Sequence, residues 1–173
     1  MSARKHSLRP WALALGALGW AWVSGCRGPA KVSQAPDFAL QDLEGHAVSL
    51  NGLRGKVVLL DFWATWCGPC HESIPFFESL YEKNRRSGFV VVGIDEDAEE
   101  GDVRRFVRRT RMTYPVVMDA SNRLMDDYQV AGLPTTFLLD PRGRVRARWV
   151  GFAEDIGNDM EKTLKSLLDE RGN

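Results

Sequence analysis

Two apolar runs of strand length lie in the first half of the chain. Residues 57–63 read Val-Val-Leu-Leu-Asp-Phe-Trp, and residues 89–95 read Phe-Val-Val-Val-Gly-Ile-Asp. Nearly continuous apolar runs of this length are typical of strands buried on both faces. Between them, residues 67–86 repeat apolar side chains at helical spacing, namely Ile74, Phe77, Leu80 and Tyr81. Strand, helix and strand in this order predict a parallel βαβ unit.

The same reading predicts the remaining elements. Further strands are predicted at residues 38–40, 47–50, 116–118, 135–140 and 145–149. Helical segments are predicted at residues 103–111, 124–128 and 160–168. Gly45 lies in the turn of an N-terminal hairpin, and residues 141–143 join a second antiparallel hairpin. The pattern predicts an α/β fold with a mixed central sheet, helices on both faces and an N-terminal β-hairpin.

The first 25 residues have the pattern of an export signal. A positive stretch holds Arg4, Lys5 and Arg9. The apolar run 11–23 that follows is shorter than the roughly 20 residues of a membrane-spanning helix. It ends in Val-Ser-Gly before Cys26, which resembles the bacterial lipobox, where that cysteine is lipidated and the signal is removed. An ordinary signal peptide and a short uncleaved anchor are the alternatives.

These features give three parts of the chain. Residues 1–25 are assigned to a lipoprotein signal peptide, residues 26–35 to the lipidated cysteine and a linker, and residues 36–173 to the folded domain. The whole chain has 23 Lys and Arg against 23 Asp and Glu, so nothing in its charge indicates a nucleic-acid partner. Loss of the signal removes three basic residues and leaves a mildly acidic domain. Membrane contact is therefore expected through the lipid on Cys26.

Two cysteines remain once Cys26 is assigned to lipid. Export would place Cys67 and Cys70 in a compartment where disulfides persist. A bridge over so short a loop constrains little of the unfolded chain, because the stabilisation grows with loop length. We therefore expect a reactive pair instead of a structural one.

The position of this pair suggests how it divides the chemistry. Cys67 falls where a strand gives way to a helix, and a helix N-terminus stabilises a thiolate. Cys67 is therefore expected to be the exposed nucleophile, and Cys70, one turn later, the more buried resolving thiol. Gly68 permits close approach of a substrate backbone, and Pro69 is tolerated in a first helical turn.

Residues 61–70, Asp-Phe-Trp-Ala-Thr-Trp-Cys-Gly-Pro-Cys, resemble the active-site segment of thioredoxins. Pro75 matches the kinking proline of the family, and residues 132–136, Gly-Leu-Pro-Thr-Thr, resemble its cis-proline loop. The opening Ala-Pro-Asp-Phe at 35–38 and the insert at 96–115 are more similar to tethered TlpA/ResA-type reductases. The resemblance implies a thioredoxin-like fold and thiol–disulfide oxidoreductase activity. It implies no cofactor beyond the redox-active disulfide, and no metal.

The resemblance also implies roles for neighbouring residues. Pro134 would be cis and would face the cysteines. The backbone of Leu133 would pair with an extended substrate segment. Trp66, Gly68 and Pro69 would complete the substrate-binding surface.

Two departures concern the proton acceptor for Cys70. Tethered members often have Glu where this chain has Ser73, and the nearest glutamate here is Glu72, one residue earlier. Those members often have Asn where this chain has Asp61, whereas cytoplasmic thioredoxins have a buried Asp. A buried carboxylate without a partner has a raised pKa. Asp61 is therefore the expected proton acceptor, with Glu72 as the rival, or else a hydrogen-bonded strand residue without a catalytic role.

Other classes of protein were weighed against this one. Residues 67–71 also satisfy the C-x-x-C-H pattern of haem attachment through His71, but a buried α/β pattern surrounds them. A peroxidase of the peroxiredoxin type would need a Pro/Thr-rich pocket around one cysteine, which is not evident. A redox-inert binding lipoprotein would have no use for two vicinal thiols.

The direction of electron flow rests on the residues between the cysteines. Gly-Pro is the dipeptide of thioredoxin, whose potential is about −270 mV. This favours a reductase of extracytoplasmic protein disulfides that is re-reduced by a membrane electron donor. The protein is expected to be a monomer tethered by its lipid.

Overall fold

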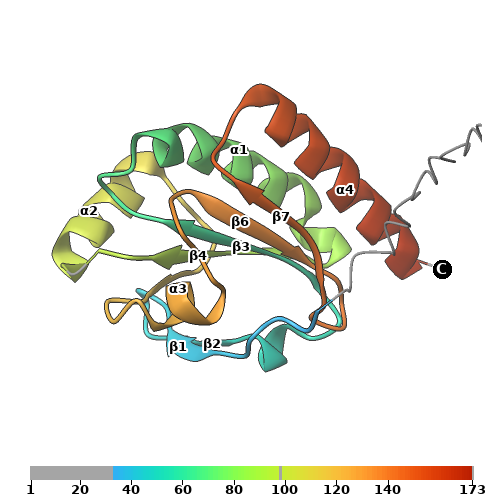
Figure 1. Ribbon diagram of the computed structural model, residues 1–173, viewed down its shortest axis with the longest axis horizontal. Coiled ribbons are helices and arrows are strands. Elements are labelled where there is room, and N and C mark those ends of the chain that lie inside the picture. The colour runs from blue at the N-terminus through green and yellow to red at the C-terminus, as the bar shows by residue number, and fades with distance from the viewer. Residues whose placement is uncertain (1–32, 98, 173) are drawn as a thin grey trace, which may run out of the picture. The chain divides into compact units, whose positions relative to one another are not determined.

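The computed structural model describes residues 33–97 and 99–172 (Figure 1). The strands are β1 (Ala39–Gln41), β2 (Ala47–Ser49), β3 (Val57–Trp63), β4 (Phe89–Asp95), β5 (Val116–Met118), β6 (Thr135–Leu139) and β7 (Val145–Val150). The helices are α1 (Gly68–Asn84), α2 (Glu100–Thr110), α3 (Arg123–Asp127) and α4 (Glu154–Gly172), with short 3-10 turns at Asn51–Leu53 and Arg85–Ser87. Every predicted strand and helix is present.

Five strands form one mixed sheet in the order β5-β4-β3-β6-β7. β3 pairs in parallel with β4, and β4 with β5, whereas β6 runs antiparallel to both β3 and β7. β1 and β2 form a separate antiparallel hairpin. The predicted βαβ unit is therefore β3-α1-β4, and the mixed sheet with its N-terminal hairpin is confirmed.

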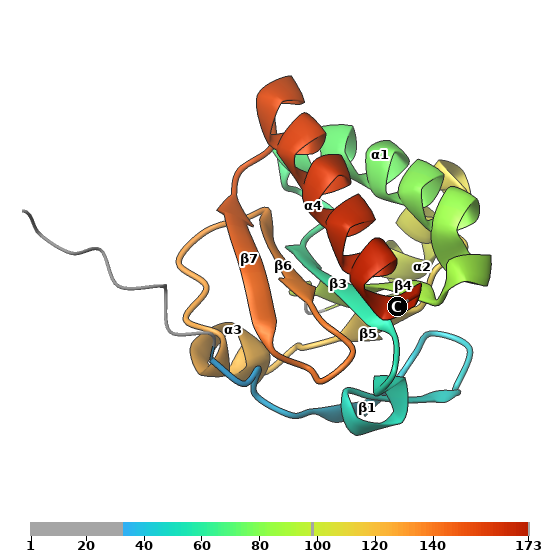
Figure 2. The same cartoon turned by 90° about the vertical axis from the view of Figure 1, so that its right-hand side faces the viewer.

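Both faces of the sheet are covered, because side chains alternate along each strand. Leu59 and Trp63 of β3 pack into a cluster with apolar residues of α1, α2 and α4. Leu60 and Phe62 pack on the opposite face with residues of α3 and the hairpin. Figures 1 and 2 show these two layers, with α1, α2 and α4 on one face and α3 with the hairpin on the other. All seven residues of β3 are buried, as its continuous apolar run predicts.

Two helices begin earlier than their apolar periodicity predicts. α2 starts at Glu100 instead of 103, and α4 starts at Glu154 instead of 160. Both first turns carry acidic side chains, which favour a helix N-terminus by opposing the positive end of its dipole. These turns are polar, so a search for apolar spacing misses them.

Residues just before the predicted start of the folded domain bond to the β6–β7 hairpin. Residues 33–35 were assigned to the linker, but they bind the turn between β6 and β7. The N–H of Ala35 donates to the carbonyl oxygen of Gly143 at 3.0 Å, and the N–H of Val145 donates to that of Ser33 at 2.9 Å. The segment is polar and short, so composition alone did not distinguish it from linker. The proposed signal and Cys26 lie outside the described residues, and no helix within 33–97 or 99–172 could span a membrane.

Candidate active site

The cysteine pair lies where β3 passes into α1. β3 ends at Trp63, and Cys67 is the N-cap of α1, with φ −81° and ψ 104°. The N–H of Cys67 donates to the carbonyl oxygen of Ala64 at 3.1 Å, which closes the connecting turn. Pro69 lies in the first turn of the helix, where its missing N–H leaves no bond unmade. The strand-to-helix junction predicted from the sequence is confirmed.

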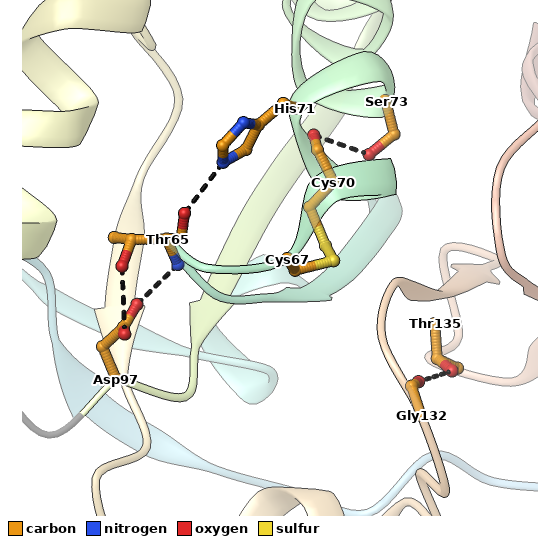
Figure 3. Close-up of a disulfide and its surroundings, with 8 residues drawn as sticks. All are labelled: Thr65, Cys67, Cys70, His71, Ser73, Asp97, Gly132 and Thr135. Carbon is orange, nitrogen blue, oxygen red and sulfur yellow. Dashed lines mark hydrogen bonds between the residues drawn. A yellow bond between two sulfur atoms is a disulfide. The ribbon is translucent and has the colours of Figure 1, made fainter.

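Cys67 and Cys70 are joined in a disulfide with an S–S distance of 2.02 Å (Figure 3). Cys70 is fully buried and Cys67 is only 4% exposed. The prediction of an exposed Cys67 is therefore too strong for this oxidised form, although Cys67 is the more accessible of the two.

The electrostatic setting of Cys67 suits a nucleophile. The first turn of α1 contains no acidic side chain, so nothing there cancels the positive end of the helix dipole. After reduction, a thiolate at the N-cap would lie at the positive end of the helix dipole, which stabilises it. Cys70 lies one turn into the helix, where burial disfavours the charged thiolate.

Asp61 is a carboxylate buried in the core on the face of β3 that α1 covers. It lies on the same face as Leu59 and Trp63, which share a packed cluster with Cys70. Asp61 is 0% exposed, and within the described part of the chain neither of its oxygens has a hydrogen-bond partner. Burial raises the pKa of Asp61 to about 8. Asp61 can therefore exchange a proton near neutral pH.

The surroundings of Asp61 are unusually polar for a protein core. In the sheet it pairs with Gly93 of β4 and Thr136 of β6. A side chain at Gly93 would place its Cβ 3.0 Å from Nε1 of Trp63 and 3.3 Å from the ring of Tyr114, so the glycine leaves room for those groups. Trp63 Nε1, the Tyr114 hydroxyl and the Thr136 hydroxyl are all buried without a partner among the described residues.

Glu72, the rival proton acceptor, and Ser73, the position where tethered members often have Glu, do not share the environment of Asp61. Glu72 is exposed on the surface of α1. Ser73 is buried, and its hydroxyl donates to the carbonyl oxygen of Cys70 at 3.2 Å. Ser73 therefore replaces the glutamate of similar sequences with a neutral group that is already bonded to the helix. Of the two candidate proton acceptors, Glu72 is exposed, whereas Asp61 is buried on the face of β3 that packs against the cluster containing Cys70.

The residues expected to contact a substrate surround the disulfide. Trp66 is 70% exposed, and Gly68 and Pro69 are exposed beside it. The Leu133–Pro134 bond is cis, as the resemblance implied, and Leu133 is half-buried. A bond from the Thr135 hydroxyl to the Gly132 carbonyl oxygen at 2.7 Å closes the 132–135 turn, and Figure 3 includes both residues in the close-up of the disulfide. Their roles in binding stay predictions.

The sequence reading missed the contacts of Thr65. Asp97, at the end of β4, bonds the Thr65 N–H and hydroxyl, and His71 contacts its carbonyl oxygen. The adjacent acids Asp95, Glu96 and Asp97 were a usable signal, since parallel neighbours β3 and β4 end at the same edge of the sheet. Within 33–97 and 99–172, no group of His, Cys, Asp and Glu has the geometry to hold a metal ion.

Comparison with known proteins agrees with this geometry. Residues 32–148 match the model of the AhpC/TSA family. The chain is 36% identical over 134 residues to the thiol-disulfide oxidoreductase ResA of Bacillus cereus, covering 78% of this chain and 76% of the relative.

Solved structures with the same fold have similar descriptions. A Chlorobium tepidum structure described as a DsbE-type thiol:disulfide interchange protein aligns with a TM-score of 0.77 and 37% identity, over 82% of this chain and 99% of that one. The thioredoxin domain of a Bacteroides vulgatus thiol-disulfide oxidoreductase aligns with a TM-score of 0.70 and 30% identity, over 79% and 99%.

Fold, site and relatives together define a thioredoxin-like thiol–disulfide oxidoreductase that works through Cys67 and Cys70. The chain belongs to the AhpC/TSA family, and the ResA-type oxidoreductases are among its relatives. This agrees with the activity predicted from the sequence and favours it over a peroxidase, a haem protein or a redox-inert binding lipoprotein.

Proposed function

We propose that this oxidoreductase reduces disulfides of extracytoplasmic proteins while tethered to a membrane by lipid on Cys26. The observation that carries the direction is the Gly68-Pro69 pair between the cysteines at the start of α1. The same dipeptide occurs in thioredoxin, which is reducing at about −270 mV. The signal-like residues 1–25 and the lipobox-like segment before Cys26 support the location.

The reaction begins from the reduced pair. The Cys67 thiolate attacks one sulfur of a substrate disulfide, the substrate S–S bond breaks, and the first substrate thiolate leaves. A mixed disulfide now joins Cys67 to the substrate. Cys70 then loses its proton and attacks the Cys67 sulfur, which releases the second substrate thiolate and restores the Cys67–Cys70 disulfide. Two electrons have passed to the substrate, and a membrane electron donor returns two electrons and two protons to the pair.

Asp61 is the proposed acceptor of the Cys70 proton. The thiol is buried, so its ionisation needs a base inside the core. Because the pKa of Asp61 is raised to about 8, the group is mostly protonated at pH 7, and its minority carboxylate form is the one that takes the Cys70 proton. Glu72 is exposed on the helix surface and Ser73 is neutral, which leaves Asp61 as the base on the Cys70 side of the sheet.

The direction is tested by the reduction potential. Equilibration of the full domain with glutathione redox buffers should give a value of about −220 to −280 mV. A value close to about −120 mV, as in a strongly oxidising member of the superfamily, would overturn the reductase proposal.

The substrate class is tested by trapping. Cys70→Ser removes the resolving thiol, so the mixed disulfide at Cys67 should accumulate with extracytoplasmic proteins that carry disulfides. The matched variant Cys67→Ser should trap none of them. Trapping by Cys67→Ser and not by Cys70→Ser would reverse the assigned roles of the two cysteines.

The anchor is tested separately from the chemistry. Cys26→Ser should release the protein into the soluble extracytoplasmic fraction, with its disulfide exchange in solution unchanged. Continued membrane retention of the variant would show that the apolar run 11–23 is itself the anchor.

A further inference from the structure

Thr65 has all of its polar groups bound by two side chains from outside its own turn (Figure 3). Its N–H donates to Asp97 Oδ2 at 2.6 Å, and its hydroxyl donates to Asp97 Oδ1 at 3.1 Å. His71 Nε2 lies 2.8 Å from the Thr65 carbonyl oxygen, so that nitrogen carries the hydrogen and donates it. These contacts, here called the Thr65 clamp, lie two residues before Cys67.

Asp97 reaches the loop from a fixed base. Its N–H donates to Asp95 Oδ1 at 3.0 Å. The N–H of Glu96 donates to the carbonyl oxygen of Trp63 at 3.0 Å, and Trp63 pairs with Asp95 in the sheet. The carboxylate that holds the loop is therefore tied to the same strand pair from which the loop emerges.

His71 is oriented by packing from another element. Its ring centroid lies 5.0 Å from that of Phe106 on α2, and Phe106 in turn lies 5.1 Å from Trp63. His71 directly follows Cys70 in the helix, and its ring bonds Thr65, two residues before Cys67. It therefore connects the chain on either side of the cysteine pair.

The clamp is more than the capping of a neighbouring helix. Both carboxylate oxygens of Asp97 bond Thr65, and Glu99, the N-cap of α2, makes no side-chain bond to the first turn of that helix. Burial raises the pKa of Asp95 to about 8. Asp95 is therefore largely protonated at neutral pH, and it accepts the Asp97 N–H without placing a second full charge beside that carboxylate.

Thiol–disulfide exchange makes demands on this loop. Reduction adds two electrons and two protons, breaks the S–S bond and leaves two thiols that separate beyond bonding distance. For attack, the Cys67 thiolate must lie at the N-terminus of α1, with a clear path between its sulfur and the substrate sulfur. The backbone before Cys67 must therefore hold its place in both redox states.

We propose that Asp97 and His71 are positioning residues for thiol–disulfide exchange, holding Thr65 by its three polar groups so that Cys67 stays at the N-cap of α1. The inference rests on exchange at Cys67 and Cys70, and it is independent of whether the protein reduces or oxidises its partners.

The first test compares two substitutions at Asp97. Asp97→Ala removes both bonds to Thr65, and the second-order rate of reduced protein with glutathione disulfide should fall about 10- to 100-fold, as for a misplaced reacting group. Asp97→Asn can still accept the Thr65 N–H through Oδ1 and donate to its hydroxyl through Nδ2, so its rate should stay within about threefold of wild type. Stopped-flow tryptophan fluorescence measures both.

The second test removes the other arm and supplies controls. His71→Ala should slow exchange with glutathione disulfide, and combining it with Asp97→Ala should cost less than the product of the single effects, because both hold one residue. Asp102→Ala, an exposed acid of α2, should leave the rate unchanged. Circular dichroism confirms folding of each variant. If Asp97→Ala fails to fold, Thr65→Val, which loses only the hydroxyl bond, should still slow exchange measurably.

Three results would overturn the proposal. They are an unchanged rate in Asp97→Ala, an unchanged rate in folded Thr65→Val where Asp97→Ala does not fold, and equal slowing in Asp97→Ala and Asp97→Asn, which would assign the effect to charge. A wild-type protein that fails to exchange at all would instead refute the function of the cysteine pair, so the two failures are distinct.

Discussion

Buried carboxylates at the two ends of the central sheet differ in their hydrogen bonding and in the direction of their pKa shifts. Asp140 directly follows β6, at the end of the sheet away from the disulfide. It is 3% exposed, and both of its carboxylate oxygens accept hydrogen bonds. Its oxygens accept the N–H groups of Arg142 and Arg144 and the guanidinium of Arg144. Burial alone would raise the pKa of Asp140, but these bonds outweigh it and hold the pKa below its ordinary value.

The end that carries the disulfide has the contrary pattern. Asp61 has no partner for either oxygen, and Asp95 and Glu96 also keep buried oxygens unbonded within the described residues. Burial raises the pKa of each of these three groups to about 8. A carboxylate that serves the fold is bonded, as Asp140 is. The carboxylates with unbonded buried oxygens lie at the end of the sheet that carries the disulfide, where the proposed exchange needs proton transfer. Leaving buried oxygens unbonded costs stability, and groups of this kind are typical of functional sites.

The largest effect should come from Asp61→Asn. The variant keeps the size of the side chain but cannot accept the Cys70 proton, so the resolving step should slow about 100- to 10,000-fold while attack by Cys67 stays nearly normal. Stopped-flow kinetics of mixed-disulfide formation and decay would separate the two steps. Glu72→Gln is the matched control and should leave both unchanged. If Glu72→Gln alone slows decay, the exposed glutamate is the base.

The next largest effect should be the pH dependence of stability. The folded state holds protons on Asp61, Asp95 and Glu96 that the unfolded chain releases above about pH 4. Their stabilising effect is full below the ordinary carboxyl pKa and is lost as pH rises toward 8. Urea denaturation should therefore show the free energy of unfolding falling between pH 5 and pH 8, with the fully buried Asp61 contributing up to about 1.4 kcal/mol per pH unit and the partly solvated Glu96 less. Asp61→Asn should flatten this decline.

A smaller effect of opposite sign is expected at the other end of the sheet. Asp140→Asn loses the charge-assisted bond to Arg144 and should destabilise the domain at pH 7 by about 1–2 kcal/mol. The lowered pKa of Asp140 gives stability that is present above the ordinary carboxyl pKa and lost as pH falls through the lowered pKa, so variant and wild type should converge in acid. Exchange with glutathione should be unaffected. A slower exchange would show that the two ends are coupled.

The smallest effect should come from Ser73→Ala. Ser73 is buried near the redox centre, but its hydroxyl is bonded to the Cys70 carbonyl oxygen, so it resembles Asp140 more than Asp61. Thermal unfolding should show a change of at most about 1 kcal/mol, and mixed-disulfide decay should keep its wild-type rate. A marked slowing of decay would mean that Ser73 takes part in the proton path.

Local patterns in the sequence were sufficient for most of the fold. The continuous apolar run of β3, the spacing of Ile74 and Phe77 in α1 and the turn at Gly45 each state a preference that tertiary packing then satisfies. The polar first turns of α2 and α4 were missed, because their signal is charge against a dipole instead of apolar spacing.

From residue patterns alone the site was predictable only where it is local, whereas the cis bond before the distant Pro134 was predicted from the family resemblance. Cys67, Cys70 and Pro69 lie together in the chain, so their arrangement follows from one strand-to-helix junction. The bonds from Asp97 to Thr65 span 32 positions and depend on strand pairing between β3 and β4. No periodicity reports such a contact, and it becomes visible only once the register of the two strands is known.

The short N-terminal segment at 33–35 has a consequence for self-association. β5 and β7 are the outer strands of the sheet, and exposed strand edges are templates for pairing with another copy of the chain. The hairpin covers part of one edge through the bridge of Asp42 to Val117. On the other edge, Gln34 forms a bridge with Arg144 at the start of β7. A protein trimmed to begin at residue 36 would keep its redox centre, but it would lose the buried side chain of Ala35 and uncover the start of β7. Such a protein should aggregate more readily than the full domain while its thiol–disulfide exchange is retained.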